Sequence, residues 1–208
     1  MKMKKSILTE KGGIQMASVA TYIVEILIRE KIVQREEQEI YCYGMELLLY
    51  TCLNASLILL LGFIFQDVFA GVLYFLVLAT VRTQTGGYHA SSYMNCGILY
   101  CTVFILVFYI SELLKKTEIS TVFYVMLLIL NLFIMWKNAP VLHKKSLSES
   151  EKKQAVKRVG IRGIGWIIAV CGFSLFNESG MFVIGNSMLM ITAFMIIGKY
   201  AEKRGEKE

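Results

Sequence analysis

Six apolar runs, each close to the length of a membrane-spanning helix, constrain this sequence more than any other feature. A helix needs about 20 residues to cross the hydrocarbon of a bilayer. The runs occupy residues 45–65, 67–82, 96–114, 119–136, 160–177 and 180–198, and the second is short unless it includes Gln66 or Thr83. Hydrophobic residues make up 56% of the 208 residues, whereas soluble domains average about 45–50%. The sequence therefore predicts an all-α, polytopic membrane helix bundle with about six transmembrane helices.

The basic residues predict how this bundle is oriented. If the N-terminus is cytoplasmic, 20 of the 22 Lys and Arg lie on the cytoplasmic side, and only Lys115 and Lys116 lie outside. Cytoplasmic loops carry such an excess, so both termini and the Arg82–Asn95 loop are expected in the cytoplasm. The same bias explains the net charge of +6 without a nucleic-acid partner. Cysteines facing this reducing compartment should be free.

The segment before the first run differs from the rest. Residues 14–40 are expected to form an amphipathic helix at the membrane interface, with a plain soluble helix as the alternative. Its apolar face consists of Ile14, Ala17, Ala20, Ile23/Val24, Leu27/Ile28 and Ile32, opposite Glu25 and Arg29. The predicted division is residues 1–40 for this segment, 41–198 for the transmembrane domain and 199–208 for a charged cytoplasmic tail. Gly160, Gly163, Gly165, Gly180 and Gly185 should allow close helix packing.

A polar stretch, "RTQTGGYHASSYMNC", interrupts the apolar runs between the second and the third. It contains one of only two His in the chain, His89, and Cys96 seven residues later. Seven residues on a straight helix span about 10.5 Å, too far for a hydrogen bond. The two side chains can therefore act together only if the chain turns between them. A short polar hairpin that merely joins two helices is the alternative.

The sequence allows such a turn. Gly86 and Gly87 tolerate positive φ angles, and Ser91 or Ser92 is a natural N-cap for the third span. Cys96 would then lie in the first turn of that helix, where the helix dipole favours a thiolate.

The other candidate groups have weaker patterns. Cys42 is the main rival nucleophile but has no His near it in the sequence, and Cys101 is expected to pack inside its span. His143 lies in the basic segment Lys137–Arg158, which is expected to be a solvated loop. The Cys and His spacing does not match that of a zinc site, so no metal or cofactor is expected.

The stretch "VRTQTGGYHASSYMNC" resembles the signature of the accessory gene regulator B family of bacterial membrane peptidases. These enzymes mature the cyclic autoinducer peptides of quorum sensing. The family pattern begins with an Arg, followed by three variable residues and then two small residues. One further variable residue precedes a His-Ala pair, and a Cys lies seven residues after the His. Arg82, Gly86, Gly87, His89, Ala90 and Cys96 occupy these positions.

This resemblance implies a function. Cys96 corresponds to the nucleophile and His89 to its base, within the transmembrane domain. The implied reaction cleaves a small propeptide at its C-terminal side through a thioester acyl-enzyme, which then cyclises to a thiolactone or lactone. The resemblance also implies a homodimer in the bacterial cell membrane, with the active site facing the cytoplasm.

Further residues are candidates for supporting roles. Arg82 could bind a substrate carboxylate or hold the loop, or simply anchor the helix end at the headgroups. Glu46 could orient His89 as the third member of a triad, and Ser92, Gln84 and Asn95 are candidates for the same role. Gly86 and Gly87 could permit close approach of substrate.

Two other classes of membrane protein are compared with this sequence as alternatives to the peptidase. Prenyl-peptidase-like enzymes carry Glu-Glu with an Arg four residues later, but here Glu36-Glu37 is followed by Tyr41 at that place. A small peptide exporter without peptidase chemistry is the remaining alternative. It predicts ionisable residues near the middle of the membrane, and the apolar runs carry almost none.

Overall fold

The computed structural model describes residues 11–82, 85, 93–117, 119–139 and 149–205, and every regular element in this part is helical. The α-helices are α1 (Lys11–Arg29), α2 (Gln38–Ile64), α3 (Val68–Val77), α5 (Tyr93–Lys115), α6 (Thr121–Asn138), α7 (Glu149–Phe176) and α8 (Glu178–Gly205). A 3₁₀ turn, η1 (Arg35–Glu37), precedes α2, and a π turn, η2 (Leu78–Arg82), follows α3. Five helices are long and apolar enough to cross a membrane, and Val68–Arg82 forms a shorter apolar helix. The predicted all-α membrane protein is confirmed.

The chain divides into two compact units, which are described separately. The first comprises residues 1–57 and 90–101, and the second comprises residues 58–89 and 102–208. The first unit thus contains α1, most of α2 and the beginning of α5. The second contains α3, η2, α6, α7, α8 and the remainder of α2 and α5.

In the first unit, α1 is amphipathic as predicted but shorter. Ala20 and Val24 are buried, whereas Glu25 and Arg29 are exposed. The helix ends at Arg29 instead of continuing to residue 40. Lys31 adopts a left-handed backbone conformation, with φ of 58°, and this conformation commonly ends a helix. Ile32 is consequently 69% exposed, so its predicted place on the apolar face is wrong.

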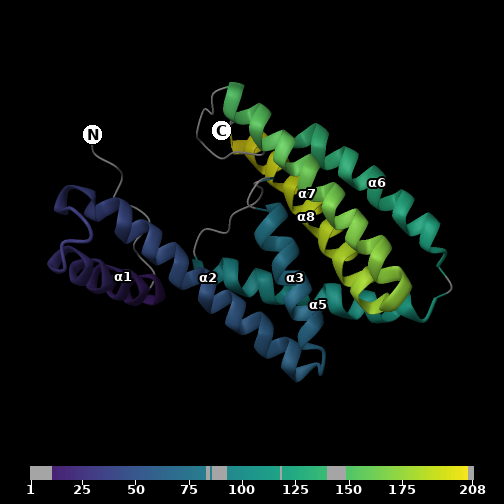
Figure 1. The fold of residues 1–208 in the computed structure, drawn as a ribbon, viewed down its shortest axis with the longest axis horizontal. Coiled ribbons are helices and arrows are strands. Elements are labelled where there is room, and N and C mark those ends of the chain that lie inside the picture. The colour runs from purple at the N-terminus through teal and green to yellow at the C-terminus, as the bar shows by residue number, and fades with distance from the viewer. Residues whose placement is uncertain (1–10, 83–84, 86–92, 118, 140–148, 206–208) are drawn as a thin grey trace. The chain divides into compact units, whose positions relative to one another are not determined.

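In the second unit, α8 is the central helix. It packs against α3, α6 and α7, and Figure 1 shows α6, α7 and α8 running side by side. Every residue from Gly180 to Met188 is buried. A helix that is buried all round must satisfy its polar groups inside the protein.

A hydrogen-bonded network meets this requirement. Tyr124 of α6 donates to Asn186 Oδ1 at 3.1 Å, and Asn186 Nδ2 donates to Ser111 Oγ of α5 at 3.0 Å. The Ser111 hydroxyl in turn donates to the Val107 carbonyl at 2.7 Å. All three side chains are buried. Uncharged polar groups of three helices are therefore joined across the core.

Only some of the predicted glycines permit close helix packing. A Cβ atom at Gly185 would collide with Tyr124, one at Gly163 with Leu132, and one at Gly180 would lie 2.8 Å from Phe173. At Gly160 and Gly165 a Cβ would meet nothing within 4 Å, so the prediction is wrong for those two. The space beside α7 at these two positions is open in the described part of the chain.

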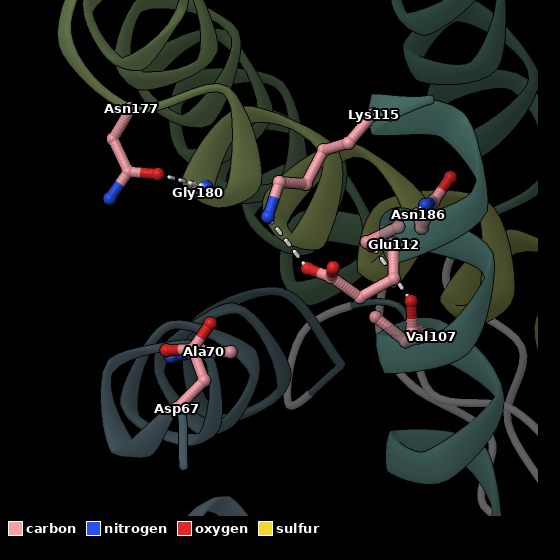
Figure 2. Close-up of polar contacts among 9 residues, drawn as sticks. Asp67, Ala70, Val107, Glu112, Lys115, Asn177, Gly180 and Asn186 are labelled. Carbon is pink, nitrogen blue, oxygen red and sulfur yellow. Dashed lines mark hydrogen bonds and ion pairs between the residues drawn. The ribbon is translucent and has the colours of Figure 1, made fainter. Parts of the chain in front are cut away.

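Local capping explains where two helices of the bundle begin. The Asp67 carboxylate accepts from the Ala70 amide at 2.9 Å, and the Asn177 side chain accepts from the Gly180 amide at 3.1 Å, as Figure 2 shows. Such bonds satisfy amides that the first turn of a helix leaves unpaired.

Two helices are longer than the apolar runs that they contain. α7 begins at Glu149, so the basic segment before residue 160 is partly helical and not a loop up to Arg158. α8 continues to Gly205, past the predicted start of the tail at residue 199. Lys199 lies within this helix and donates to Asn138 Oδ1 of α6 at 2.9 Å. Charged helical turns beyond the membrane carry no hydropathy signal, which is why both ends were missed.

Candidate functional site

Cys96 occupies the first turn of a helix, as predicted. α5 begins at Tyr93, three residues earlier. The Cys96 side chain is half-buried, and all five cysteines (Cys42, Cys52, Cys96, Cys101 and Cys171) are free. The unpaired amides and dipole of a helix N-terminus stabilise an anion nearby. The position at the start of α5 therefore suits a nucleophilic residue.

Several predicted site residues lie outside the described part of the chain. They are Gln84, Gly86, Gly87, His89, Ser91, Ser92 and His143. The approach of His89 to Cys96 therefore remains a prediction, as does the Ser91/Ser92 cap. Asn95, the other polar candidate on α5, is exposed.

An asparagine of α2 lies against the turn that carries Cys96, and the sequence analysis did not select it. A Cβ atom at Gly97 would lie 2.7 Å from Asn54 Oδ1. Glycine at position 97 therefore lets the Asn54 side chain approach the α5 backbone directly beside Cys96. Asn54 is half-buried. Its position within an apolar span was the available signal, because polar residues inside membrane helices usually have a partner or a function.

Glu46 shares a helix face with Asn54. Glu46, Tyr50 and Asn54 follow one another at intervals of four residues along α2; Tyr50 is buried and Glu46 is half-buried. The eight residues from Glu46 to Asn54 correspond to about 12 Å along the helix. Asn54 of α2 therefore lies beside the turn of α5 that carries Cys96. Glu46 lies about two helical turns closer to the N-terminus of α2.

In the second unit, Arg82 is the last residue of the π turn η2, and it is half-buried. Turns of this type are rare and often occur at functional sites. Thr85, which follows shortly, is fully buried, and its hydroxyl donates to the Arg82 carbonyl at 3.4 Å. The sequence correctly places Arg82 at the end of the second apolar helix but does not reveal the π geometry.

Two side chains of α7 hold this π turn from the side. Arg162 Nη1 donates to the Thr80 carbonyl at 2.6 Å, and Trp166 Nε1 donates to Thr80 Oγ1 at 2.8 Å. In the sequence, Arg162 is only one of the 20 basic residues expected on the cytoplasmic side. Its partner is 82 residues away in the sequence, a separation that no local pattern encodes.

The other cysteines and possible metal ligands are less distinctive. Cys42 is half-buried on α2 and Cys101 is half-buried on α5. Within the described ranges, no three His, Cys, Asp or Glu side chains are grouped so that they could hold a metal ion.

Comparison with known proteins adds a family relationship to this geometry. AgrB-like protein 2 of Clostridium perfringens strain 13 is 25% identical over 181 residues, covering 84% of this chain and 85% of its own length. An AgrB-like protein of Clostridium perfringens strain SM101 is 24% identical over 177 residues, covering 79% of this chain and 83% of its own. No solved structure matches.

A family model extends this relationship across both units and the segment from Arg82 to Cys96. The model described as accessory gene regulator B matches residues 20–200. The match includes every described transmembrane helix except for the last residues of α8. On this evidence, the chain belongs to the accessory gene regulator B family.

Proposed function

We propose that the protein is a membrane-embedded cysteine endopeptidase that processes an autoinducer propeptide in the bacterial cell membrane. The observation that carries this proposal is the placement of a free, half-buried Cys96 in the first turn of α5, at the end of the Arg82–Gly86-Gly87–His89 register. The family relationship supports the substrate class. The expected orientation places this turn on the cytoplasmic side.

In the proposed first step, His89 accepts the thiol proton of Cys96, and the thiolate attacks a backbone carbonyl of the propeptide. When the tetrahedral intermediate collapses, the C–N bond breaks and His89 returns the proton to the departing amine. The C-terminal part of the propeptide leaves as a free peptide. The N-terminal part remains as a thioester on Cys96. Backbone amides at the start of α5 are candidate donors to the oxyanion.

In the second step, a Cys or Ser side chain of the bound peptide attacks the thioester carbonyl. The peptide becomes a thiolactone or lactone ring, and the Cys96 thiol is regenerated. Exchange of one thioester for another is nearly isoenergetic, so this step requires no ATP. Water must be excluded from the acyl-enzyme, because hydrolysis would otherwise release a linear peptide.

The remaining site residues are proposed to have supporting roles. Arg82 is proposed to bind the substrate or to order the loop, and Gly86, Gly87 and Ser92 are proposed to form the turn that brings His89 to Cys96. Glu46 and Asn54 are the candidate groups on α2 for orienting the imidazole. By analogy with the family, the protein is expected to act as a homodimer.

The test is co-expression with a candidate propeptide from the same genome and detection of products by mass spectrometry. Cys96→Ala and His89→Ala should each abolish cleavage and cyclisation. Cys101→Ala, on the same helix, and Cys42→Ala are matched controls that should retain activity. Cyclic product formed by Cys96→Ala at the wild-type rate would refute the peptidase.

A peptide exporter would require a different core. Among the described residues, the buried polar side chains are Thr85, Ser111, Asn131, Asn186, Ser187 and Thr192, and none of them is ionisable. Ion-coupled transporters usually place acidic or basic groups at this depth. The described core therefore favours the peptidase over an ion-coupled exporter.

A further inference from the structure

The π turn η2 is held by two donors from a distant helix. Arg162 and Trp166 are four residues apart, so they lie on the same face of α7, and both bind Thr80. The Thr80 hydroxyl also donates to the Leu76 carbonyl of the preceding turn at 2.6 Å. Both the carbonyl and the hydroxyl of this one residue are therefore fixed.

These contacts differ from those of ordinary interfacial anchors. Arg and Trp at the end of a membrane helix commonly reach toward lipid headgroups. Here both side chains are half-buried and bind the protein itself. Thr80 lies in η2, and the Arg162 guanidinium binds its carbonyl. A guanidinium is a strong donor for a backbone carbonyl.

The geometry of η2 affects the orientation of the residues that follow it. A π turn contains about one residue more than an α turn, so its conversion to α geometry would rotate everything beyond it by about 100°. Arg82 follows Thr80 by two residues and His89 follows it by nine. The direction in which the chain from Arg82 toward His89 begins therefore depends on whether η2 keeps its π geometry.

We propose that Arg162 and Trp166 are positioning residues, which keep η2 in its π form so that Arg82 and the His89 segment start in the orientation that the reaction requires. This inference rests on the proposed peptidase function. Neither residue is proposed to touch substrate. They act through Thr80, and their loss should slow the chemical step more than it weakens substrate binding.

The central experiment removes one hydrogen bond with minimal change of shape. Trp166→Phe removes the indole N–H, and Thr80→Val removes the hydroxyl that accepts from it. Each should lower kcat for propeptide cleavage about tenfold, with KM changed less than about twofold. The double variant should be no slower than the slower single variant, because both singles break the same bond. Thr80→Ser, which retains the hydroxyl, should restore most of the rate.

Arg162 is tested with a graded pair of substitutions. Arg162→Lys retains one cationic donor and should cost less than Arg162→Gln, for which a loss in kcat of up to about a hundredfold is expected from misplaced reacting groups. Trp136→Phe is the matched control, because Trp136 is 54% exposed on α6 and is the only other Trp in the chain.

That control also supplies a measurement independent of activity. In a Trp136→Phe background Trp166 is the sole tryptophan, so its emission reports the hydrogen bond to Thr80. Thr80→Val should shift this emission, whereas Thr80→Ser should leave it unchanged. An unchanged emission in Thr80→Val would refute the contact and, with it, the positioning role.

The outcomes separate this inference from the proposed function. If cleavage depends on Cys96 but Trp166→Phe, Thr80→Val and Arg162→Gln retain wild-type kcat per folded molecule, the positioning role is refuted and the peptidase stands. If these variants only reduce the amount of folded protein, the residues are structural and the inference also fails. If Cys96→Ala remains active, both proposals fail even where the emission shift is observed.

Discussion

The helices α8 and α2 have similar lengths and similar apolar character, yet they occupy opposite environments. In the most apolar window of α8, 67% of residues are buried inside the protein, compared with 17% in α2. The sequences differ in a simple way. The buried part of α8 contains Gly185, Asn186 and Ser187, whereas α2 carries the run of leucines at 57–61 that is broken only by Ile58. Hydropathy detects both spans. What separates them is that Gly185, Asn186 and Ser187 of α8 are buried, whereas Thr51 and Ser56 of α2 are exposed.

This difference follows from how helices associate in lipid. Lipid tails are as apolar as leucine, so burying leucine against another helix gains little from the hydrophobic effect. Close contact and hydrogen bonding decide which helix lies inside. The contrast can be tested with pairs of matched substitutions in the two helices.

The largest expected effect comes from filling the position of the most crowded glycine. Gly185→Leu would collide with Tyr124 and should lower the free energy of unfolding by about 3 kcal/mol, or prevent folding. Gly44→Leu on α2 is the matched control, because a Cβ there meets nothing within 4 Å. Its effect should be neutral or stabilising by about 1 kcal/mol. Unfolding in detergent measures both, and equal destabilisation would contradict the contrast.

Loss of a buried apolar side chain should have the second-largest effect. Ile184 is fully buried on α8, whereas Leu60 is 55% exposed on α2. Ile184→Ala should destabilise the protein by about 2 kcal/mol through lost packing, and Leu60→Ala by less than about 0.5 kcal/mol. The same unfolding assay applies. A larger loss for Leu60→Ala would show that a partner covers this face of α2.

The polar network should contribute somewhat less. Asn186→Ala leaves Tyr124 and Ser111 without their shared partner, at an expected cost of about 1 kcal/mol. A double-mutant cycle with Tyr124→Phe measures the coupling between the two side chains. Additive losses would mean that the hydrogen bond does not contribute to stability.

The smallest change in stability, but a measurable change in activity, is expected where α2 meets α5. Gly97→Ala would push Asn54 Oδ1 away from the turn that carries Cys96, so cleavage should fall about threefold to tenfold with little loss of folded protein. Asn54→Ala in the same background should relieve the crowding. If Asn54→Ala alone has no effect on cleavage and the double variant behaves as Gly97→Ala does, Asn54 plays no part in the site.

The sequence was sufficient to predict some parts of this molecule for identifiable reasons. Transmembrane helices are predictable because a continuous run of about 20 apolar residues is typical of a membrane-spanning helix and uncommon elsewhere. The position of Cys96 in a first turn was predictable from the serines that precede it. The ends of α7 and α8 were not, because charged helical turns outside the membrane resemble loops in composition.

The remaining features depend on contacts that are distant in the sequence. The bonds from Arg162 and Trp166 to Thr80 and the approach of Asn54 to Gly97 each join two separate helices. Likewise, Gly163 and Gly165 are the same residue type on the same helix. A Cβ atom at Gly163 would collide with Leu132 of α6, whereas one at Gly165 would meet nothing within 4 Å. Local patterns cannot specify which faces of two helices meet.

The short helix Val68–Arg82 has a consequence for the surrounding lipid. Its apolar residues end at Val81, before Arg82, and the 15 described residues rise about 22 Å, roughly 8 Å less than a typical hydrocarbon core. Such hydrophobic mismatch thins the bilayer locally or draws headgroups inward. Under the proposed function, a peptide substrate that arrives from water would meet Arg82 without entering hydrocarbon. Reconstitution in lipids of increasing acyl-chain length should accordingly raise KM for the propeptide, so that membrane thickness itself becomes a determinant of substrate access.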